Sequence, residues 1–349
     1  MLIRNSIIIY KYNMDLSTEK HNVIAIHHNE LRLWDTATNK SLVSYGDMGF
    51  EYGRLSIKKE EIKCNSYIMM VRFDFGTVHI YDIYTGATID KLQHVNTFNI
   101  CDTHMAMSYY GKKQVIEITD LQTMKKMHFN NVIDLHELCI NSKHIAGLEF
   151  DNRRLKVFDF TKKKPNVPII DIYTNHNRLI MNKNYIFLIS VYGEHCLVSI
   201  ISLAKKIFVK NDILIHGGSC RMHLNPINDT VYVSVWRTLS DIQIISFDPQ
   251  TLKQKAMTYD TGNFAIGTAI ATCPAIPDNP HILWGNGANY TDNLIIHHDD
   301  KKITYKNWET NNKYFELIKV VLDINTYVKK LLIKHIIPDI SIIVLAYLY

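Results

Sequence analysis

Short stretches in which apolar and polar residues alternate recur along the first 310 positions of the chain. One example is Thr77–Asp82 (TVHIYD), which ends in an aromatic residue followed by aspartate. Alternation with a period of two is typical of a half-buried β-strand, and the Gly, Asn and Asp residues between the stretches favour turns. The pattern therefore predicts an all-β fold.

The strand that ends in an acidic or small polar residue is repeated at a regular interval. The closing residues of the seven copies are Asp35, Asp82, Asp120, Asp159, Ser202, Asp248 and Asp299. They are spaced by about 40–50 residues, close to the length of one four-stranded blade of a β-propeller. Blades stacked around an axis cover the two faces that a lone sheet leaves exposed. We therefore expect residues 1–310 to form a seven-bladed propeller.

Two ways of closing this ring are open. Residues 6–12 contain the apolar run Ile7-Ile8-Ile9 and can supply the first strand of the first blade. In that case the ring closes by face packing alone. Alternatively, the same residues pair with the last blade as a strand clasp.

The repeated strands resemble WD40 repeats, most closely in the segment Trp34-Asp35-Thr36-Ala37-Thr38. The WD-like marks of the blades are Trp34, Asp35, Tyr81, Asp82, Asp120, Phe158, Asp159, Phe247 and Asp248. The chain departs from the family in having one literal Trp-Asp pair and no Gly-His dipeptide. This puts in question the hydrogen-bonded His–Asp network that locks many WD40 blades.

The resemblance implies a rigid platform that binds peptides or partner domains near the central channel and is rarely catalytic. In its degenerate repeats the chain is similar to WD-repeat proteins of large DNA viruses and of some protists. We accordingly expect a non-enzymatic scaffold in the cytoplasm, or in the host cytoplasm if the protein is viral.

From residue 311 to residue 349 the apolar period changes from that of a strand to that of a helix. The spacing predicts one amphipathic helix over 313–335 and a second that begins at Pro338, where proline is tolerated. The candidate docking residues of this tail are Ile337, Pro338, Ile340, Val344, Tyr347 and Leu348. The simplest expectation is that both helices pack against the propeller.

The end of the tail also resembles the opening of an F-box, or the F-box-like motif that ends many poxvirus ankyrin proteins. Such motifs recruit a cullin ubiquitin ligase, which would make the protein a substrate receptor. The match departs from the pattern because it is one residue shorter between Pro338 and Tyr347-Leu348 and lacks the usual acidic residue.

Charge and cysteine content narrow the function classes. A net charge of +5, from 39 basic and 34 acidic residues, is mild for 349 residues, so we expect no nucleic-acid partner. The apolar run Ile340–Tyr349 falls short of the roughly 20 residues of a membrane span, so no membrane association is expected. The six cysteines include no CxxC pair, which predicts free thiols in a reducing compartment rather than disulfides or zinc ligands.

Few residues of the chain suggest catalysis or metal binding. His297 and His298 are neighbours in a predicted strand and point to opposite faces, so they do not readily share a metal ion. The segment His216-Gly217-Gly218 is similar to a lipase oxyanion loop, but the chain contains no GxSxG nucleophile motif. We assign no catalytic, cofactor or metal residue. The alternative hypothesis is a propeller enzyme, such as a metal-dependent hydrolase or lactonase, with carboxylates, Asn or His converging on the central channel.

Overall fold

Every regular element in the part of the chain that the computed structural model describes is a β-strand. The residues that it describes are 21–27, 30–35, 40–47, 50–51, 54–55, 62–65, 67–74, 76–110, 115–130, 135–149, 154–162, 168–174, 176, 178–192, 194–217, 219–224, 229–236, 241–260, 268–271, 281–285, 294–298, 301–305 and 316–322. The all-β prediction is confirmed for this part of the chain. The same residues include no helix long and apolar enough to cross a membrane.

The described strands form seven four-stranded antiparallel sheets and one short hairpin. Sheet one contains β1 (His21–His27), β2 (Glu30–Asp35), β3 (Lys40–Asp47) and β30 (Glu316–Leu322). Sheet two contains β6 (Ile62–Cys64), β7 (Ile68–Asp74), β8 (Thr77–Asp82) and β9 (Thr88–Leu92). The hairpin pairs β4 (Phe50–Glu51) with β5 (Arg54–Leu55).

Sheets three to five continue the meander. Sheet three contains β10 (Val95–Ile100), β11 (His104–Tyr109), β12 (Val115–Asp120) and β13 (Lys126–Asn130). Sheet four contains β14 (Leu135–Ile140), β15 (His144–Glu149), β16 (Arg154–Asp159) and β17 (Ile170–Tyr173). Sheet five contains β18 (Arg178–Met181), β19 (Tyr185–Tyr192), β20 (His195–Ser202) and β21 (Ile207–His216).

The last two sheets have the same order. Sheet six contains β22 (Ser219–Leu224), β23 (Val231–Trp236), β24 (Asp241–Phe247) and β25 (Gln254–Asp260). Sheet seven contains β26 (Thr268–Ala271), β27 (His281–Gly285), β28 (Leu294–His298) and β29 (Lys301–Tyr305).

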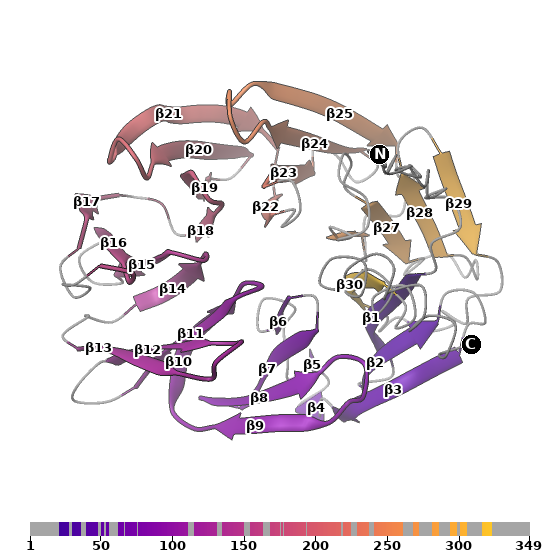
Figure 1. Cartoon of the computed structure of the whole chain (residues 1–349). Coiled ribbons are helices and arrows are strands. Elements are labelled where there is room, and N and C mark those ends of the chain that lie inside the picture. The colour runs from indigo at the N-terminus through magenta and orange to yellow at the C-terminus, as the bar shows by residue number, and fades with distance from the viewer. Residues whose placement is uncertain are drawn as a thin grey trace, which may run out of the picture.

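The sheets stand around a common axis, as Figure 1 shows, and this is the architecture of a β-propeller. The first strand of each sheet from two to six lies toward the centre, and neighbouring first strands β6, β10, β14, β18 and β22 contact one another. The last strand of each of these sheets lies at the rim, where β9, β13, β21 and β25 are seen in Figure 1. Each meander therefore runs from the axis outward.

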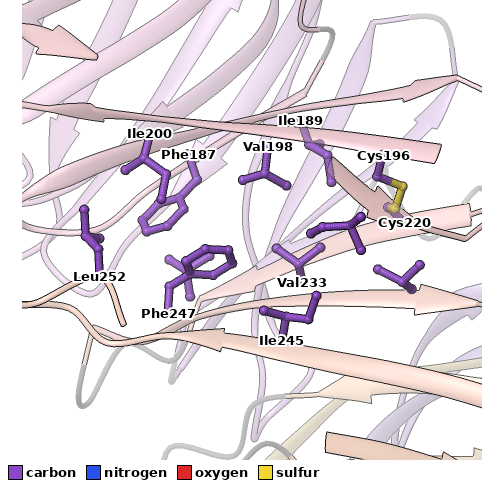
Figure 2. Packing of buried hydrophobic residues seen from close by; sticks show 13 residues of the cluster. Phe187, Ile189, Cys196, Val198, Ile200, Cys220, Val233, Ile245, Phe247 and Leu252 are labelled. Carbon is purple, nitrogen blue, oxygen red and sulfur yellow. A yellow bond between two sulfur atoms is a disulfide. The ribbon is translucent and has the colours of Figure 1, made fainter. Parts of the chain in front are cut away.

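The hydrophobic core is divided into layers that lie between consecutive sheets. Between sheets five and six, the rings of Phe187 and Phe247 meet edge to face at 5.5 Å, and Val198 and Val233 are fully buried beside them. Figure 2 shows this layer. In inner strands such as β15, alternate side chains point to the preceding and the following sheet and both sets are buried, whereas outer strands such as β9 are largely exposed.

Strand β30 closes the first sheet, since its residues pair with β1 while β1, β2 and β3 come from the beginning of the chain. The paired residues include Val23 and Val320. The helix predicted over 313–335 is therefore wrong for residues 316–322, which form a strand. A strand clasp does exist in the fold, but it is made by β30; residues 6–12 lie outside the described residues.

The second predicted helix and the docking residues Ile337, Pro338, Ile340, Val344, Tyr347 and Leu348 also lie outside the described residues. The division of the chain into 1–310 and 311–349 stays a prediction.

One pair of cysteines contradicts the prediction of free thiols. Cys196 of β20 and Cys220 of β22 form a disulfide that joins sheets five and six, with the Cα atoms 6.5 Å apart (Figure 2). The two positions are 24 residues apart in sequence, and only the stacking of the sheets brings them together. Cys64, Cys101 and Cys139 are free thiols, as predicted.

Candidate binding face

The propeller has two ends that differ in chemistry. In sheets two to six, the turns that follow the first and third strands lie at one end, which we call the aspartate end because it carries Asp82, Asp120, Asp159 and Asp248. The turns that follow the second strand, and the connections to the next sheet, lie at the opposite end. We call this second end the tyrosine end, after the exposed residues Tyr110, Tyr173 and Tyr192.

The aspartates of the WD-like marks organise the turns in which they lie. Asp248 Oδ1 accepts hydrogen bonds from Gln250 N, Thr251 N and Thr251 Oγ1, at 3.0, 2.6 and 2.8 Å. Asp82 makes the same set of bonds with Tyr84 and Thr85. In each of these carboxylates, Oδ1 accepts its hydrogen bonds from within the turn, as in an Asx turn.

Two further marks repeat this arrangement with small changes. Asp120 Oδ1 accepts from Gln122 N and Thr123 N, and Asp159 Oδ1 accepts from Thr161 N and Thr161 Oγ1. The turns end in residues with positive φ, namely Gly86, Met124 and Leu252. The Asp-x-x-Thr pattern of Asp82, Asp120 and Asp248, shortened to Asp-x-Thr at Asp159, is therefore a structural signal for the turn between the third and fourth strands.

The aromatic residues of the marks belong to the core. Tyr81, Phe158 and Phe247 are buried between sheets. Trp34 is half-buried, with the guanidinium of Arg32 lying 5.7 Å from the centre of its ring, and Asp35 is half-buried at the end of β2. The marks thus hold the fold together, and their placement does not assign them a binding role.

His–Asp pairs exist at two marks, although the Gly-His dipeptide is absent. His104 and His144 begin the second strands of sheets three and four and stand opposite Asp120 and Asp159 in register. Their Nε2 atoms lie 3.7 and 3.9 Å from the aspartate Oδ2 atoms, which is too far for a direct hydrogen bond.

Burial governs the protonation of these histidines. Burial lowers the pKa of His144 below its ordinary value, and the nearby Asp159 offsets this in part. For Asp159 itself burial acts to raise the pKa, but hydrogen bonds from Thr161 and the positive neighbours outweigh it, so the pKa is lowered. The pair therefore favours a neutral imidazole beside a carboxylate.

A repeated asparagine at the aspartate end links one sheet to the next. The side-chain amide nitrogen donates to a backbone carbonyl of the following sheet in three cases: Asn65 to Cys101 at 3.1 Å, Asn141 to Asn182 at 2.9 Å, and Asn182 to Asp229 at 2.9 Å. In each case Oδ1 also accepts from two backbone N–H groups of its own turn. Sequence reasoning missed these residues; the available signal was an asparagine three residues before the second strand.

The tyrosine end carries large side chains that the core does not use. Tyr110, Tyr173 and Tyr192 are 56%, 63% and 51% exposed and come from sheets three, four and five, which are consecutive. Near them, Arg154 and Asp171 form an ion pair at 2.7 Å. His195 and His216 face each other across β20 and β21. Sequence reasoning did not single out any of these seven residues as a surface.

The described residues contain no group of three or more His, Cys, Asp or Glu side chains arranged to hold a metal ion. His297 and His298 end β28 in the structure, at consecutive positions of one strand. His216 and Gly217 lie at the end of β21 and just beyond it, where Gly217 N donates to Glu194 O at 2.7 Å. This segment therefore completes a connection between sheets five and six.

Comparison with known proteins shows the fold alone. No family model matches the chain, and no curated protein matches it. A solved protein of unknown function from Desulfotomaculum acetoxidans is similar with a TM-score of 0.53 at 12% identity, over 86% of this chain and 99% of that one.

Two other solved structures have lower scores. The β-propeller domain of Cps50 (Swd1) from Myceliophteria thermophila gives a TM-score of 0.47 at 11% identity, over 69% of this chain and 85% of that one. The dihydro-heme d1 dehydrogenase NirN gives 0.49 at 12% identity; the match covers 82% of this chain and 63% of that protein's length. The similar structures thus include a propeller domain and an enzyme.

Proposed function

We propose that this protein is a non-catalytic interaction scaffold, a seven-bladed propeller that binds a partner protein at its tyrosine end. The observation that carries the proposal is the exposure of Tyr110, Tyr173 and Tyr192 at the same end of three consecutive sheets. Tyrosine is enriched at protein interfaces because it offers a large apolar ring and a hydroxyl at low entropic cost.

The contrast between the two ends supports this choice. At the aspartate end, the carboxylates and amides of the repeated turns are engaged in bonds within the protein, as Asp248 and Asn141 illustrate. At the tyrosine end, the three aromatic rings remain exposed. A rigid scaffold of stacked sheets would present these rings without paying a large ordering cost on binding.

The test compares two triple variants. Tyr110→Ser, Tyr173→Ser and Tyr192→Ser alter the tyrosine end, whereas Gln122→Ser, Lys205→Ser and Gln250→Ser alter exposed positions at the aspartate end. Partners are identified by proximity labelling with the wild-type chain and then purified for calorimetry. The tyrosine variant is expected to bind at least about tenfold more weakly, since hot-spot truncations cost about 2 kcal/mol or more. Equal affinity of both variants for every partner would refute the proposal.

A more specific proposal is that this scaffold is a substrate receptor of a ubiquitin ligase. It rests on the resemblance of the segment from Ile337 to Leu348 to an F-box-like motif. Its test must spare β30, because a deletion from residue 311 would remove the inner strand of sheet one. A variant ending at residue 336 keeps β30. Unchanged recovery of cullin-ligase components with this variant would contradict the receptor role. The cytoplasmic location is likewise a prediction, tested by fractionation.

The alternative of a propeller hydrolase or lactonase is a prediction of a different class. It is tested with a panel of lactones and divalent cations, and turnover above the uncatalysed rate would favour it over the scaffold.

A further inference from the structure

Two exposed histidines lie opposite each other at the tyrosine end of sheet five. His195 begins β20 and His216 ends β21, and the two residues are paired in the antiparallel register. Their Nδ1 atoms are 3.2 Å apart, and their ring centres are 4.9 Å apart with the planes at 81°. Directly paired residues project to the same face of a sheet, in contrast to sequence neighbours such as His297 and His298.

The backbone around the pair is fixed on both sides. Tyr192 pairs with His195 across the turn between β19 and β20, and Gly217 N donates to Glu194 O at 2.7 Å. Beneath the pair, the disulfide of Cys196 anchors β20 to sheet six. The backbone positions of the two histidines are therefore fixed relative to each other before any ligand arrives.

The separation of the two nitrogens suits a single metal ion. Two imidazole nitrogens bound to one tetrahedral Zn²⁺ lie about 3.3 Å apart, because each Zn–N bond is about 2.0–2.1 Å long. Square-planar ions such as Cu²⁺ bring adjacent nitrogen ligands to about 2.8 Å, which a small rotation of the exposed rings allows, and imidazole is a preferred ligand of Zn²⁺, Cu²⁺ and Ni²⁺.

From this geometry we infer that His195 and His216 form a two-nitrogen site for a borderline divalent transition metal. Both Nδ1 atoms bind the ion, and water or a group from a partner fills its remaining positions. Without metal, the 3.2 Å contact requires that one ring carries its proton on Nδ1 and donates it to the other ring. On metal binding that proton moves to the Nε2 atom of the same ring, so a neutral pair binds the ion without net proton release. The site does not rest on the scaffold role.

The first measurement is a titration of the full chain with Cu²⁺, followed by calorimetry and electron paramagnetic resonance. The spectrum of the first equivalent should show coupling to two nitrogens. A Zn²⁺ titration followed by NMR should perturb the imidazole C–H signals of His195 and His216 first. If the signals of these two residues move last or not at all, the site does not exist.

Substitutions of single histidines test whether the metal ion binds at His195 and His216. His195→Gln and His216→Gln should each weaken binding of the first equivalent at least about tenfold, because the second ligand of a chelate acts at a high effective concentration. His94→Asn is the matched control: His94 is an exposed histidine of the same end, and its φ of 61° is one that asparagine tolerates. The inference is overturned if both Gln variants bind as tightly as the wild type, or if His94→Asn weakens binding equally.

Discussion

The side-chain amide of Asn141 donates a hydrogen bond to the carbonyl oxygen of Asn182, at 2.9 Å, and so joins sheets four and five. Asn182 in turn donates to Asp229 at the edge of sheet six. Asn182 is thus at once the acceptor of one link and the donor of the next. The geometry of the turns is therefore coupled from sheet to sheet around the aspartate end.

Asn141→Ala should lower the free energy of unfolding by about 2–3 kcal/mol, because it removes the bond to the Asn182 carbonyl and the acceptor of two backbone N–H groups, that of His144 buried and that of Lys143 partly buried. Urea denaturation followed by circular dichroism measures the loss. Asn184→Ala, at an exposed position of a neighbouring turn, is the control and should change the stability by less than about 0.5 kcal/mol. Similar stabilities of the two variants would show that the link contributes little.

Acid should destabilise the fold through the turn aspartates. Hydrogen bonds from the Thr251 backbone, the Thr251 hydroxyl and Gln250 lower the pKa of Asp248, and similar bonds lower that of Asp120. Because the pKa of these aspartates is lower in the folded chain than the value of about 3.9 in the unfolded chain, their ionised carboxylates stabilise the fold above about pH 3.9. This contribution is lost as the pH falls through the folded-state pKa. The stability of the wild type should therefore drop below about pH 4.

Unfolding curves between pH 3 and pH 6 test this expectation. The double variant Asp120→Asn and Asp248→Asn keeps an acceptor oxygen in each turn but removes the titration. Its stability should fall less steeply with acid than that of the wild type. Parallel pH profiles would count against the turn aspartates as the cause.

The buried and half-buried histidines should make the stability of the fold depend on pH in a higher range than the turn aspartates do. Burial lowers the pKa of His104, His144 and His176 in the folded chain. Just below about pH 6.5, the approximate pKa of a histidine in the unfolded chain, the unfolded chain therefore binds more protons than the folded chain. Stability should decrease as the pH falls through about 6.5 toward 5.5. His144→Gln should flatten this slope, which urea titrations at a series of pH values can measure; a slope equal to that of the wild type would contradict the role of His144.

The Cys196–Cys220 disulfide should stabilise the chain by about 2–4 kcal/mol, because it closes a loop across 24 positions. Adding a reductant should lower the thermal midpoint of the wild type but not that of Cys220→Ser. Alkylation of the unreduced, denatured protein followed by mass spectrometry should leave both residues unlabelled. Labelling of Cys196 and Cys220 to the same extent as Cys64 would refute the bond.

The register of the closing strand can be tested with introduced cysteines. Val23 and Val320 are paired between β1 and β30, so Val23→Cys with Val320→Cys should form a disulfide on mild oxidation. Val23→Cys with Val321→Cys is one residue out of register and directs its second thiol to the other face, so it should not. Mass spectrometry of the digest distinguishes the two, and equal yields would contradict the pairing.

The sequence was sufficient to predict the all-β class because the period-two strands carry their own turn chemistry, as in Asp82-x-x-Thr85-Gly86. It was misleading for Glu316–Leu322, where apolar residues also recur at helical spacing. Two valines in this stretch favour a strand, but pairing with β1 decides the outcome, and that partner lies almost 300 residues away in the sequence.

The candidate surface could not be read from the sequence for a different reason. Tyr173 and Tyr192 look like many buried tyrosines of this chain, and only the packing of the sheets leaves them exposed. Likewise, His195 and His216 become partners through the strand register, which no local pattern reports. The exposed tyrosines and the histidine pair both depend on contacts between strands that are distant in the sequence.

The placement of β30 inside the first sheet has a consequence during synthesis. When β1, β2 and β3 have left the ribosome, the inner edge of β1 has no partner until everything between Asp47 and Glu316 has been translated. At about 5–20 residues per second, this edge of the nascent chain stays open for roughly tens of seconds. An unpaired strand edge is a template for pairing with other chains, so the nascent protein should be most prone to aggregate in the interval before β30 is made.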